Sequence, residues 1–283
     1  MNFRKLELED QSWFPKAVKD GMTDYLRFLF QTFDLYQPVV TLLWNALQKC
    51  MSRRVIDLCS GSGGAIKNIS LSIHEKYKQR IEFVLTDIVP RNKTWHYLSK
   101  QKTYSITYEP DPVDASNVPD HLKGFRTIFS GIHHFDEAGV QKIIRSTTVA
   151  GEGIAIFDGG DKNILMVLLI VLFHPLAIVL FTPFIAPFRW SRLFFTYLIP
   201  LIPIGTVWDG VVSICNLYKP GELLKIAMNS GAGNYSWKSG KISNRFGLNI
   251  SYLIGIPFLN MDQLRLAGVH GEQQMCEFYN NFL

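Results

Sequence analysis

Residues 54–64 read Arg-Val-Ile-Asp-Leu-Cys-Ser-Gly-Ser-Gly-Gly, and this stretch decides how the rest of the chain is interpreted. It is a short apolar strand that ends near an acid and runs into a glycine-rich turn. Glycines let the backbone take positive φ angles and approach a ligand closely, and the first N–H groups of a following helix face that ligand. The stretch therefore predicts a nucleotide-like ligand at the end of a buried strand.

The spacing of the turn bears on which ligand is favoured. A dinucleotide fingerprint G-x-G-x-x-G starting at Gly61 would need a glycine at position 66, where the chain has Ile66. NAD is therefore disfavoured. Asp57 precedes the turn, where a carboxylate can meet a positively charged or hydroxyl-bearing ligand. The alternative interpretation is an ordinary strand-to-helix turn with a solvated Asp57.

Three later stretches read as further strands that end in polar residues. Residues 80–87 end at Asp87, about the distance downstream at which ribose hydroxyls are bound. Residues 104–108 lead through a proline-containing loop to Asp114, and residues 125–130 run into a Gly-Ile-His-His segment. In an open α/β sheet the ligand lies at the carboxyl ends of the strands. These polar residues are therefore expected at one edge of one sheet.

With these motifs in series, residues from about 55 to 158 resemble the class I S-adenosylmethionine (SAM)-dependent methyltransferases, and the pattern extends towards the C-terminus. The resemblance implies a Rossmann-like, doubly wound α/β fold with a mostly parallel sheet of seven strands and a C-terminal antiparallel hairpin. Residues 234–243 and 248–256 are the candidates for that hairpin. SAM is the implied cofactor. Its candidate binding residues are Asp57, Cys59, Gly61, Gly63, Asp87, Ile88, Asp114, Ala115, Ser130 and Gly131.

The same resemblance assigns roles to some of these residues. Asp57 and the turn glycines would form the loop under the methionine part of SAM, Asp87 would bind the ribose, and Asp114 with the Ala115 backbone would read the adenine edge. Cys59 departs from the family, because it stands where a glycine is most common. The local backbone must therefore be one that a Cβ atom can accept.

Methyl transfer from a sulfonium requires alignment, exclusion of water and removal of any proton on the acceptor. His133 and His134 follow the fourth strand, near where the methyl group should emerge, and imidazole takes up protons near neutral pH. His133 is the first candidate for a catalytic base and His134 the second. A histidine that only lines the cofactor pocket is the alternative.

An apolar insertion follows the fifth strand. Residues 164–188 carry no formal charge and exceed the roughly 20 residues that span a bilayer, but three prolines interrupt them and Arg189 and Arg192 follow. These features favour a monotopic hairpin that dips into one leaflet with its arginines near the headgroups. A transmembrane hairpin and a soluble lid or oligomer interface are the alternatives. Insertions at this point commonly shape the acceptor pocket, so a lipophilic acceptor is expected.

The 283 residues divide into an N-terminal helical cap, 1–50, and a methyltransferase domain, 51–283, with the hydrophobic insertion at about 162–207. Acceptor-binding candidates are Trp13, Trp208, Asp209 and Ser213, for each of which a packing role is the alternative.

The composition disfavours several other classes of protein. The net charge of +5 is modest and scattered, and the fourth strand lacks the Asn/Asp-Pro-Pro-Tyr/Phe segment that holds a flipped base, so nucleic acid is not expected as a partner. The four cysteines form no C-x-x-C pair and have no histidine at metal-ligand spacing, so neither a disulfide framework nor a metal is expected. The first ten residues do not resemble a secretion signal, which favours a cytoplasmic location.

The sequence thus predicts a methyltransferase at the cytoplasmic face of a membrane, monotopic or hairpin-inserted, that methylates oxygen or carbon of a lipid-like, isoprenoid or aromatic small molecule. One alternative is methylation of a soluble metabolite, with the insertion serving as a lid or homodimer contact. The other is a binding or scaffold protein without turnover.

Overall fold

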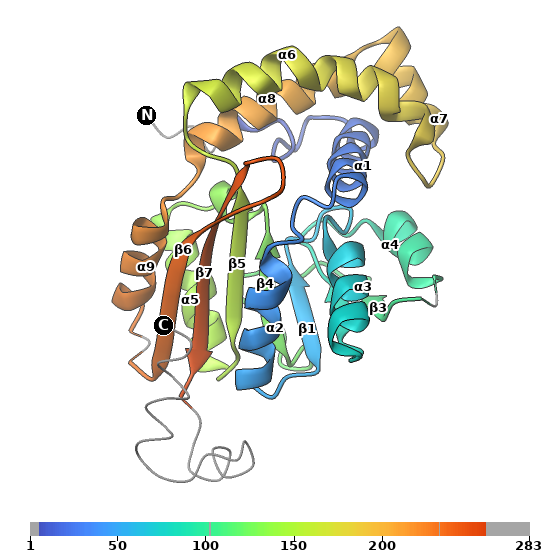
Figure 1. Cartoon of the computed structure of the whole chain (residues 1–283). Helices are drawn as coiled ribbons and strands as arrows, with labels where there is room; N and C mark the ends of the chain where they lie inside the picture. Colours follow the sequence, from blue (N-terminus) through green and yellow to red (C-terminus); the bar gives the residue numbers. More distant parts are fainter. Residues whose placement is uncertain (1–5, 102, 232, 259–283) are drawn as a thin grey trace.

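The computed structural model describes residues 6–101, 103–231 and 233–258, and its centre is a seven-stranded sheet in the order β3-β2-β1-β4-β5-β7-β6 (Figure 1). The first five strands pair in parallel, whereas β7 runs antiparallel to both β5 and β6. The predicted fold class is therefore confirmed. The strands are β1 (Arg54–Leu58), β2 (Glu82–Leu85), β3 (Ile106–Tyr108), β4 (Phe125–Phe129), β5 (Ile154–Gly159), β6 (Tyr235–Ser243) and β7 (Asn249–Pro257).

Helices cover both faces of this sheet, and alternate strand residues enter two separate cores. Val55 and Phe83 pack with α2 and α3 on one face, whereas the neighbouring Ile56 and Val84 pack with α5 and α9 on the other. Parallel strands buried on both faces read as nearly continuous apolar runs, which is why they were recognisable in the sequence. The flanking helices are α2 (Val39–Lys49), α3 (Ile66–Tyr77), α4 (Asn92–Ser99), α5 (Glu137–Val149) and α9 (Pro220–Asn229).

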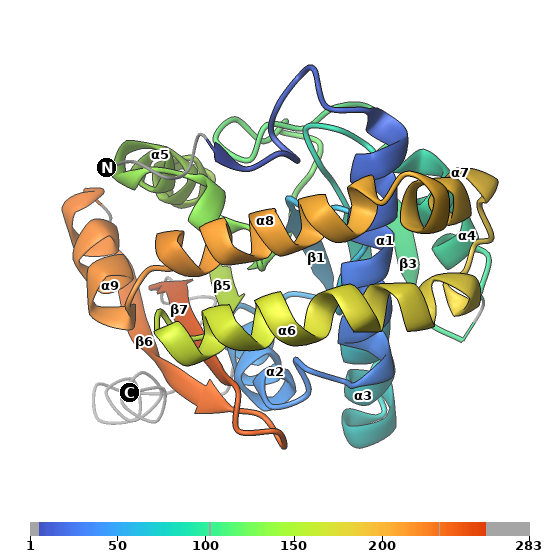
Figure 2. The same ribbon diagram turned by 90° about the horizontal axis from the view of Figure 1, so that it is seen from above.

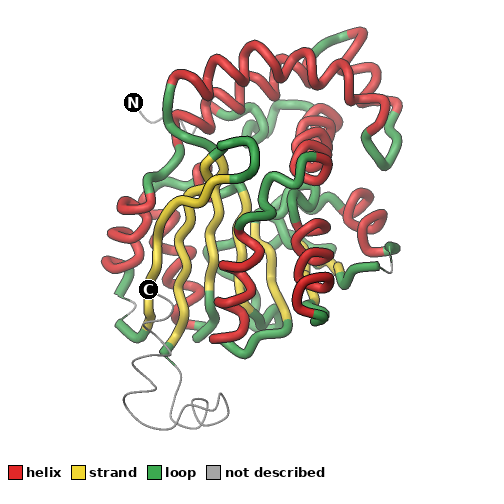
Figure 3. Tube along the Cα trace, viewed as in Figure 1, coloured by secondary structure: helices red, strands yellow, loops and turns green. Residues whose placement is uncertain are grey.

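A second group of helices lies across the carboxyl ends of the strands. In Figures 1 and 2, α6 and α8 run side by side above the sheet and pass over α1, and Figure 3 shows this upper layer as almost entirely helical. We call α6 and α8 the roof. The elements of this layer are α1 (Lys16–Thr32), η2 (Ile132–His134), α6 (Ile164–Phe181), η3 (Thr182–Phe184), α7 (Trp190–Leu193), η4 (Phe194–Leu198) and α8 (Leu201–Asn216).

The roof is apolar on both of its sides. Ile170 and Ile178 of α6 are buried, whereas Leu172, Phe173 and Leu176 are each more than half exposed. Among the described residues, the helical stretch Ile164–Phe184 is long and apolar enough to cross a membrane. Trp190–Leu198 and Leu201–Asn216 meet the same test only when taken together, and they are bent by 81°. The predicted apolar insertion is thus a pair of helices that lies against the domain.

The arginines of the insertion do not lie at the outer surface. Arg192 is 1% exposed and donates from Nη1 to Asp24 Oδ2 at 2.9 Å, and Arg189 Nε lies 3.2 Å from the same oxygen. The expectation that these arginines reach lipid headgroups is therefore wrong. An acid on α1 binds them inside the protein, which a local charge pattern could not reveal.

Asp24 is the centre of a buried ionic network. Its side chain is fully buried, it lies 3.7 Å from Arg27, and it accepts a hydrogen bond from Thr94 Oγ1 at 3.1 Å. One turn earlier on α1, Asp20 accepts from Arg91 at 2.6 Å. The network ties α1 to α4 and to the connection between the two roof helices.

Replacement of Asp24 by Asn should destabilise the protein, because the buried guanidinium groups of Arg27 and Arg192 would lose their shared counter-ion. We expect the free energy of unfolding to fall by about 3 kcal/mol. The free energy of unfolding is measured by denaturant titration of the detergent-solubilised protein, with tryptophan fluorescence as the signal. The control is Lys241→Ala, which removes a surface pair with Asp161 and should cost less than about 1 kcal/mol. Equal effects in the two variants would contradict this account.

Candidate functional site

A cavity of about 370 Å³ lies between the carboxyl ends of the strands and the underside of the roof. Gly61, Asp87 and Ser130 line its floor, and Met166 and Ser213 line it from α6 and α8. Its size is within the range of small-molecule sites, and its place is the edge at which open α/β sheets bind ligands. It is therefore the candidate ligand site.

The turn after β1 forms part of the floor through unusual backbone angles. Gly61 has φ +50° and Gly63 has φ +92°, and a Cβ atom on Gly63 would lie 2.7 Å from Leu98 Cδ1. Cys59 also adopts a left-handed conformation, with φ +55°. That conformation costs a non-glycine residue roughly 1–2 kcal/mol. Cys59 therefore takes the conformation of the glycine for which it substitutes, and it lines the cavity.

Asp57 lies beneath this turn and does not line the cavity. It is 2% exposed, and its two oxygens accept hydrogen bonds from Ser60 Oγ at 2.6 Å and Thr127 Oγ1 at 2.8 Å. Burial raises the pKa of Asp57 to about 7, although both hydroxyl groups act in the opposite direction. Asp57 thus shapes the turn from below.

Asp87 lies at the end of β2 and faces the cavity. Its Oδ2 accepts from the Gly61 N–H at 2.8 Å and its Oδ1 from the Val89 N–H at 2.9 Å. A carboxylate has about four acceptor positions, so two remain for the hydroxyls of a ligand. Ile88, the next residue, lines the cavity as well. Asp87 therefore links the glycine turn to the ligand space.

Asp114 and Ala115 lie outside the cavity wall. The exposed Asp114 side chain accepts hydrogen bonds from the N–H and the hydroxyl of Ser116, both at 2.8 Å, while Ala115 is buried. The Val113 N–H donates to the Asp87 carbonyl at 2.9 Å, which places this loop beside the end of β2. The adenine-reading role thus stays a prediction from resemblance.

Ser130 and Gly131 line the cavity on the β4 side. Ser130 has φ +48°, and its hydroxyl hydrogen-bonds to Tyr36, a buried residue between α1 and α2. Burial raises the pKa of the Tyr36 phenol, which therefore stays protonated. Tyr36 was not recognised from the sequence, because its segment carries no motif.

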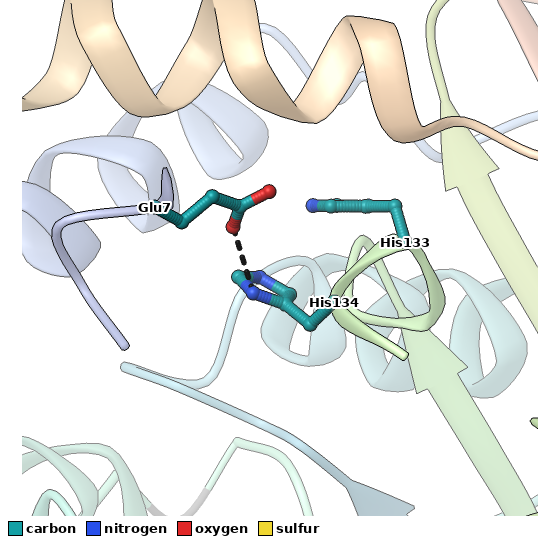
Figure 4. A group of neighbouring side chains, drawn as sticks. All are labelled: Glu7, His133 and His134. Carbon is teal, nitrogen blue, oxygen red and sulfur yellow. Dashed lines mark ion pairs between the residues drawn. The ribbon is translucent and has the colours of Figure 1, made fainter. Parts of the chain in front are cut away.

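His133 and His134 project from η2 towards the cavity, and their rings stack with centroids 4.6 Å apart. His133 is buried, and its Nδ1 lies 2.9 Å from both oxygens of Asp158 at the end of β5. An Nδ1–H donated to this carboxylate leaves Nε2 with a free lone pair. Figure 4 shows a nitrogen of His133 directed towards the carboxylate of Glu7.

His134 is an ion-pair partner rather than a free imidazole. Its Nδ1 lies 2.7 Å from Glu7 Oε2 (Figure 4) and 3.0 Å from Asp10 Oδ2. Burial alone would lower the pKa of His134, but the carboxylates of Asp10 and Glu7 raise it well above its usual range. Conversely, His134 holds the pKa of Glu7 below its usual value despite burial. His134 therefore carries a positive charge at neutral pH.

Glu7 and Asp10 belong to a segment that crosses the mouth of the cavity, residues 6–11, which we call the strap. Asp209 on α8 accepts from the Leu8 N–H at 2.6 Å and from the Glu9 N–H at 2.9 Å. Burial raises the pKa of Asp209 to about 7, although these two N–H groups act against it. The strap was missed in the sequence, since it forms no regular pattern and its partners lie about 200 positions away.

The acceptor candidates divide into two pairs. Asp209 and Ser213 line the cavity, whereas Trp208 lies outside it and donates from Nε1 to the Leu6 carbonyl at 2.7 Å. Trp13 is 70% exposed and packs edge-on against Phe14. In the structure, both tryptophans are therefore largely exposed and lie outside the cavity wall.

The sequence matches no known family model and no curated protein. Among solved structures it is similar to human N-acetylserotonin methyltransferase in complex with SAM, at 10% identity and TM-score 0.45, covering 83% of this chain and 56% of that one. Mitomycin 7-O-methyltransferase MmcR has 14% identity and TM-score 0.41, covering 75% of this chain and 53% of that one. The methyltransferase domain of bacterial CtHen1-C has 12% identity and TM-score 0.46, covering 79% of this chain and 99% of that one. The chain spans about half the length of the first two proteins.

The identities and TM-scores of these matches are low, and the fold is defined by the strand order of the sheet. Five parallel strands in the order β3-β2-β1-β4-β5 are followed by a reversed β7 inserted between β5 and β6. The sheet therefore has the topology that the resemblance to the class I methyltransferases predicts. Within this fold, the cavity brings together ten of the sixteen residues singled out from the sequence, namely Cys59, Gly61, Asp87, Ile88, Ser130, Gly131, His133, His134, Asp209 and Ser213.

The buried carboxyl of Asp57 should make stability depend on pH. Its pKa of about 7 in the fold lies above the ordinary 3.8, so its contribution is most favourable below about pH 4 and is lost as pH rises towards 7. In Asp57→Asn, stability relative to the wild type should rise by more than about 1 kcal/mol between pH 4 and pH 8. Denaturant titrations across pH measure this difference. The control Asp111→Asn alters an exposed acid and should show no such trend.

Proposed function

We propose that this chain is a SAM-dependent methyltransferase that transfers a methyl group to oxygen or carbon of a lipophilic small molecule at the cytoplasmic surface of a membrane. The observation that carries the proposal is the cavity, which lies between the glycine turn after β1 and an apolar roof. The turn supplies a place for a polar cofactor. The roof supplies a place for an apolar acceptor.

The residues of the floor fit SAM. Gly61 lines the cavity without a side chain, so a cofactor can lie directly on the backbone, and Asp87 retains acceptor positions for ribose hydroxyls. The acids Glu7, Asp10 and Asp209 also line the cavity and favour a ligand with positive charge. When bound, SAM supplies an activated methyl group on a positively charged sulfur.

The remaining tasks fall to the chain's own residues. The roof and the strap exclude water from the space above the floor. His133 faces this space and Asp158 fixes its orientation, so its Nε2 lone pair is placed to take up a proton from an acceptor hydroxyl. The two histidines thus differ in role, because His134 is occupied by the strap.

The outer face of the roof supports attachment to a membrane. Exposed apolar side chains cover it, and contiguous patches of this kind are rare on soluble monomers. The inner side of α6 contributes Met166 and Ile170 to the cavity wall, so α6 cannot leave the domain to span a bilayer without opening the site. A helix pair lying in the plane of the interface satisfies both faces. An apolar acceptor would then reach the cavity from the lipid side.

The same outer face would also suit contact with a second copy of the chain. That arrangement belongs to the alternative in which the acceptor is a soluble metabolite and the roof is a lid or dimer contact. A protein that is dimeric in solution and does not bind to vesicles would favour this alternative.

His133→Asn should reduce turnover without weakening the binding of the cofactor. We expect kcat for labelled methyl transfer to a lipid extract to fall by about 100-fold, while the SAM dissociation constant from calorimetry changes less than about threefold. The exposed His121→Asn is the matched control and should behave as wild type. A wild-type protein that does not bind SAM would refute the function itself, and undiminished turnover in His133→Asn would refute the role of His133.

Charges placed on the outer face of the roof should release the protein from membranes. In vesicle flotation, Leu172→Glu and Leu176→Glu together should lower the bound fraction about tenfold, because two carboxylates would have to enter an apolar layer. Val149→Glu places the same charge on an exposed residue of α5, away from the roof, and should leave binding unchanged. Equal binding of all three proteins would argue for the lid or dimer alternative.

A further inference from the structure

Three side chains with metal-binding donor atoms meet where the strap crosses η2. One donor atom from each of Glu7, His133 and His134 lies within 4.8 Å of the others (Figure 4). Glu7 and His133 are buried, and all three residues line the cavity. The group is therefore enclosed on the protein side and open towards the ligand space.

Neighbouring side chains orient His133 and Glu7. Asp158 binds Nδ1 of His133, which leaves Nε2 free, and metal-ligating histidines usually hydrogen-bond a carboxylate through their other nitrogen in this way. Glu7 accepts hydrogen bonds at Oε1 from Ser213 and Asn216, both at 3.4 Å. Its Oε2 is buried and receives no well-directed hydrogen bond, although His134 lies close to it. Glu7 Oε2 therefore lies beside the His134 imidazole, where a metal ion could bind both groups.

We propose that Glu7, His133 and His134 bind a divalent transition-metal ion such as Zn²⁺ at the wall of the cavity. Two imidazoles and one carboxylate form a donor set that these ions favour, whereas Mg²⁺ and Ca²⁺ prefer oxygen ligands alone. Metal–ligand bonds of about 2.0–2.1 Å in tetrahedral geometry place ligand atoms about 3.4 Å apart. The 2.7 Å contact between His134 and Glu7 must therefore open slightly, and the more distant pairs must close.

The charges around the group also favour a cation. Asp10 lies 3.0 Å from His134, so two carboxylates face this imidazole from the strap, and His133 stacks on it from the same turn. These carboxylates would stabilise a cation bound beside them.

An ion at this place would serve the reaction described above. Because its three ligands line the cavity, the ion would be accessible to an acceptor there and would lower the pKa of an acceptor hydroxyl bound to it. His133 then acts as a ligand, and its role as a base belongs to the metal-free protein. This catalytic role rests on the proposed function, whereas binding of the ion does not.

The test uses the full chain, freed of metal by a chelator and titrated with ZnCl₂ and, separately, with CoCl₂. Calorimetry should give one ion per chain, and Co²⁺ should show visible absorption. Glu7→Gln and His133→Asn should each weaken binding at least tenfold, and Asp158→Asn by about 10–100-fold. His121→Asn, at an exposed histidine paired with Glu109, should retain wild-type affinity.

The two ligand variants lie on separate elements, the strap and η2, so a folding failure in one leaves the other as the test. Absence of binding in the wild type, or unchanged affinity in the Glu7→Gln/His133→Asn double variant, overturns the proposal. SAM binding is measured on the same metal-free protein. SAM binding without metal binding refutes only the ion, and metal binding without SAM binding refutes only the methyltransferase function.

Discussion

The arrangement of the site depends on one buried carboxylate. Asp24 on α1 binds Arg192 and Arg189 from the connection between the roof helices, and the hydroxyl of Thr94 from α4. Burial of several charges is costly unless they are paired, so this network has few acceptable arrangements. It therefore fixes the roof over the carboxyl ends of the strands, which apolar packing alone would do with less specificity.

The parts of the site that could be predicted are those that follow from strands. Parallel strands end at a common edge, so Asp87, Ser130 and His133 were correctly expected near one another from local patterns alone. Side-chain direction was not predictable in the same way. Asp57 turns inward because Ser60 and Thr127 donate to it, and Asp114 turns away because it binds Ser116. Those choices depend on hydrogen bonds that the strand pattern does not encode.

The roof and the strap mark the limit of sequence reasoning. Length and composition predicted an apolar insertion after the fifth strand, but its arginines are bound by α1, far away in the chain. The strap has neither periodicity nor motif, and its bonds to Asp209 span about 200 residues. For the same reason, the cysteine and histidine spacing gave no sign of the group formed by Glu7, His133 and His134. One of its members, Glu7, comes from the N-terminal strap, whereas the two histidines follow β4.

The pair formed by His133 and Asp158 has a further consequence. His133 follows β4, and Asp158 lies at the end of the neighbouring parallel strand β5. The two strands pair Phe129 with Phe157, and the Ser130 N–H donates to the Phe157 carbonyl. The His133 imidazole is therefore held by the sheet, whereas the roof above it is a separate helical layer. Mutations in that layer can alter which molecule is admitted without displacing the imidazole. Under the proposed function, the choice of acceptor would thus depend on the roof and the position of the imidazole on the sheet.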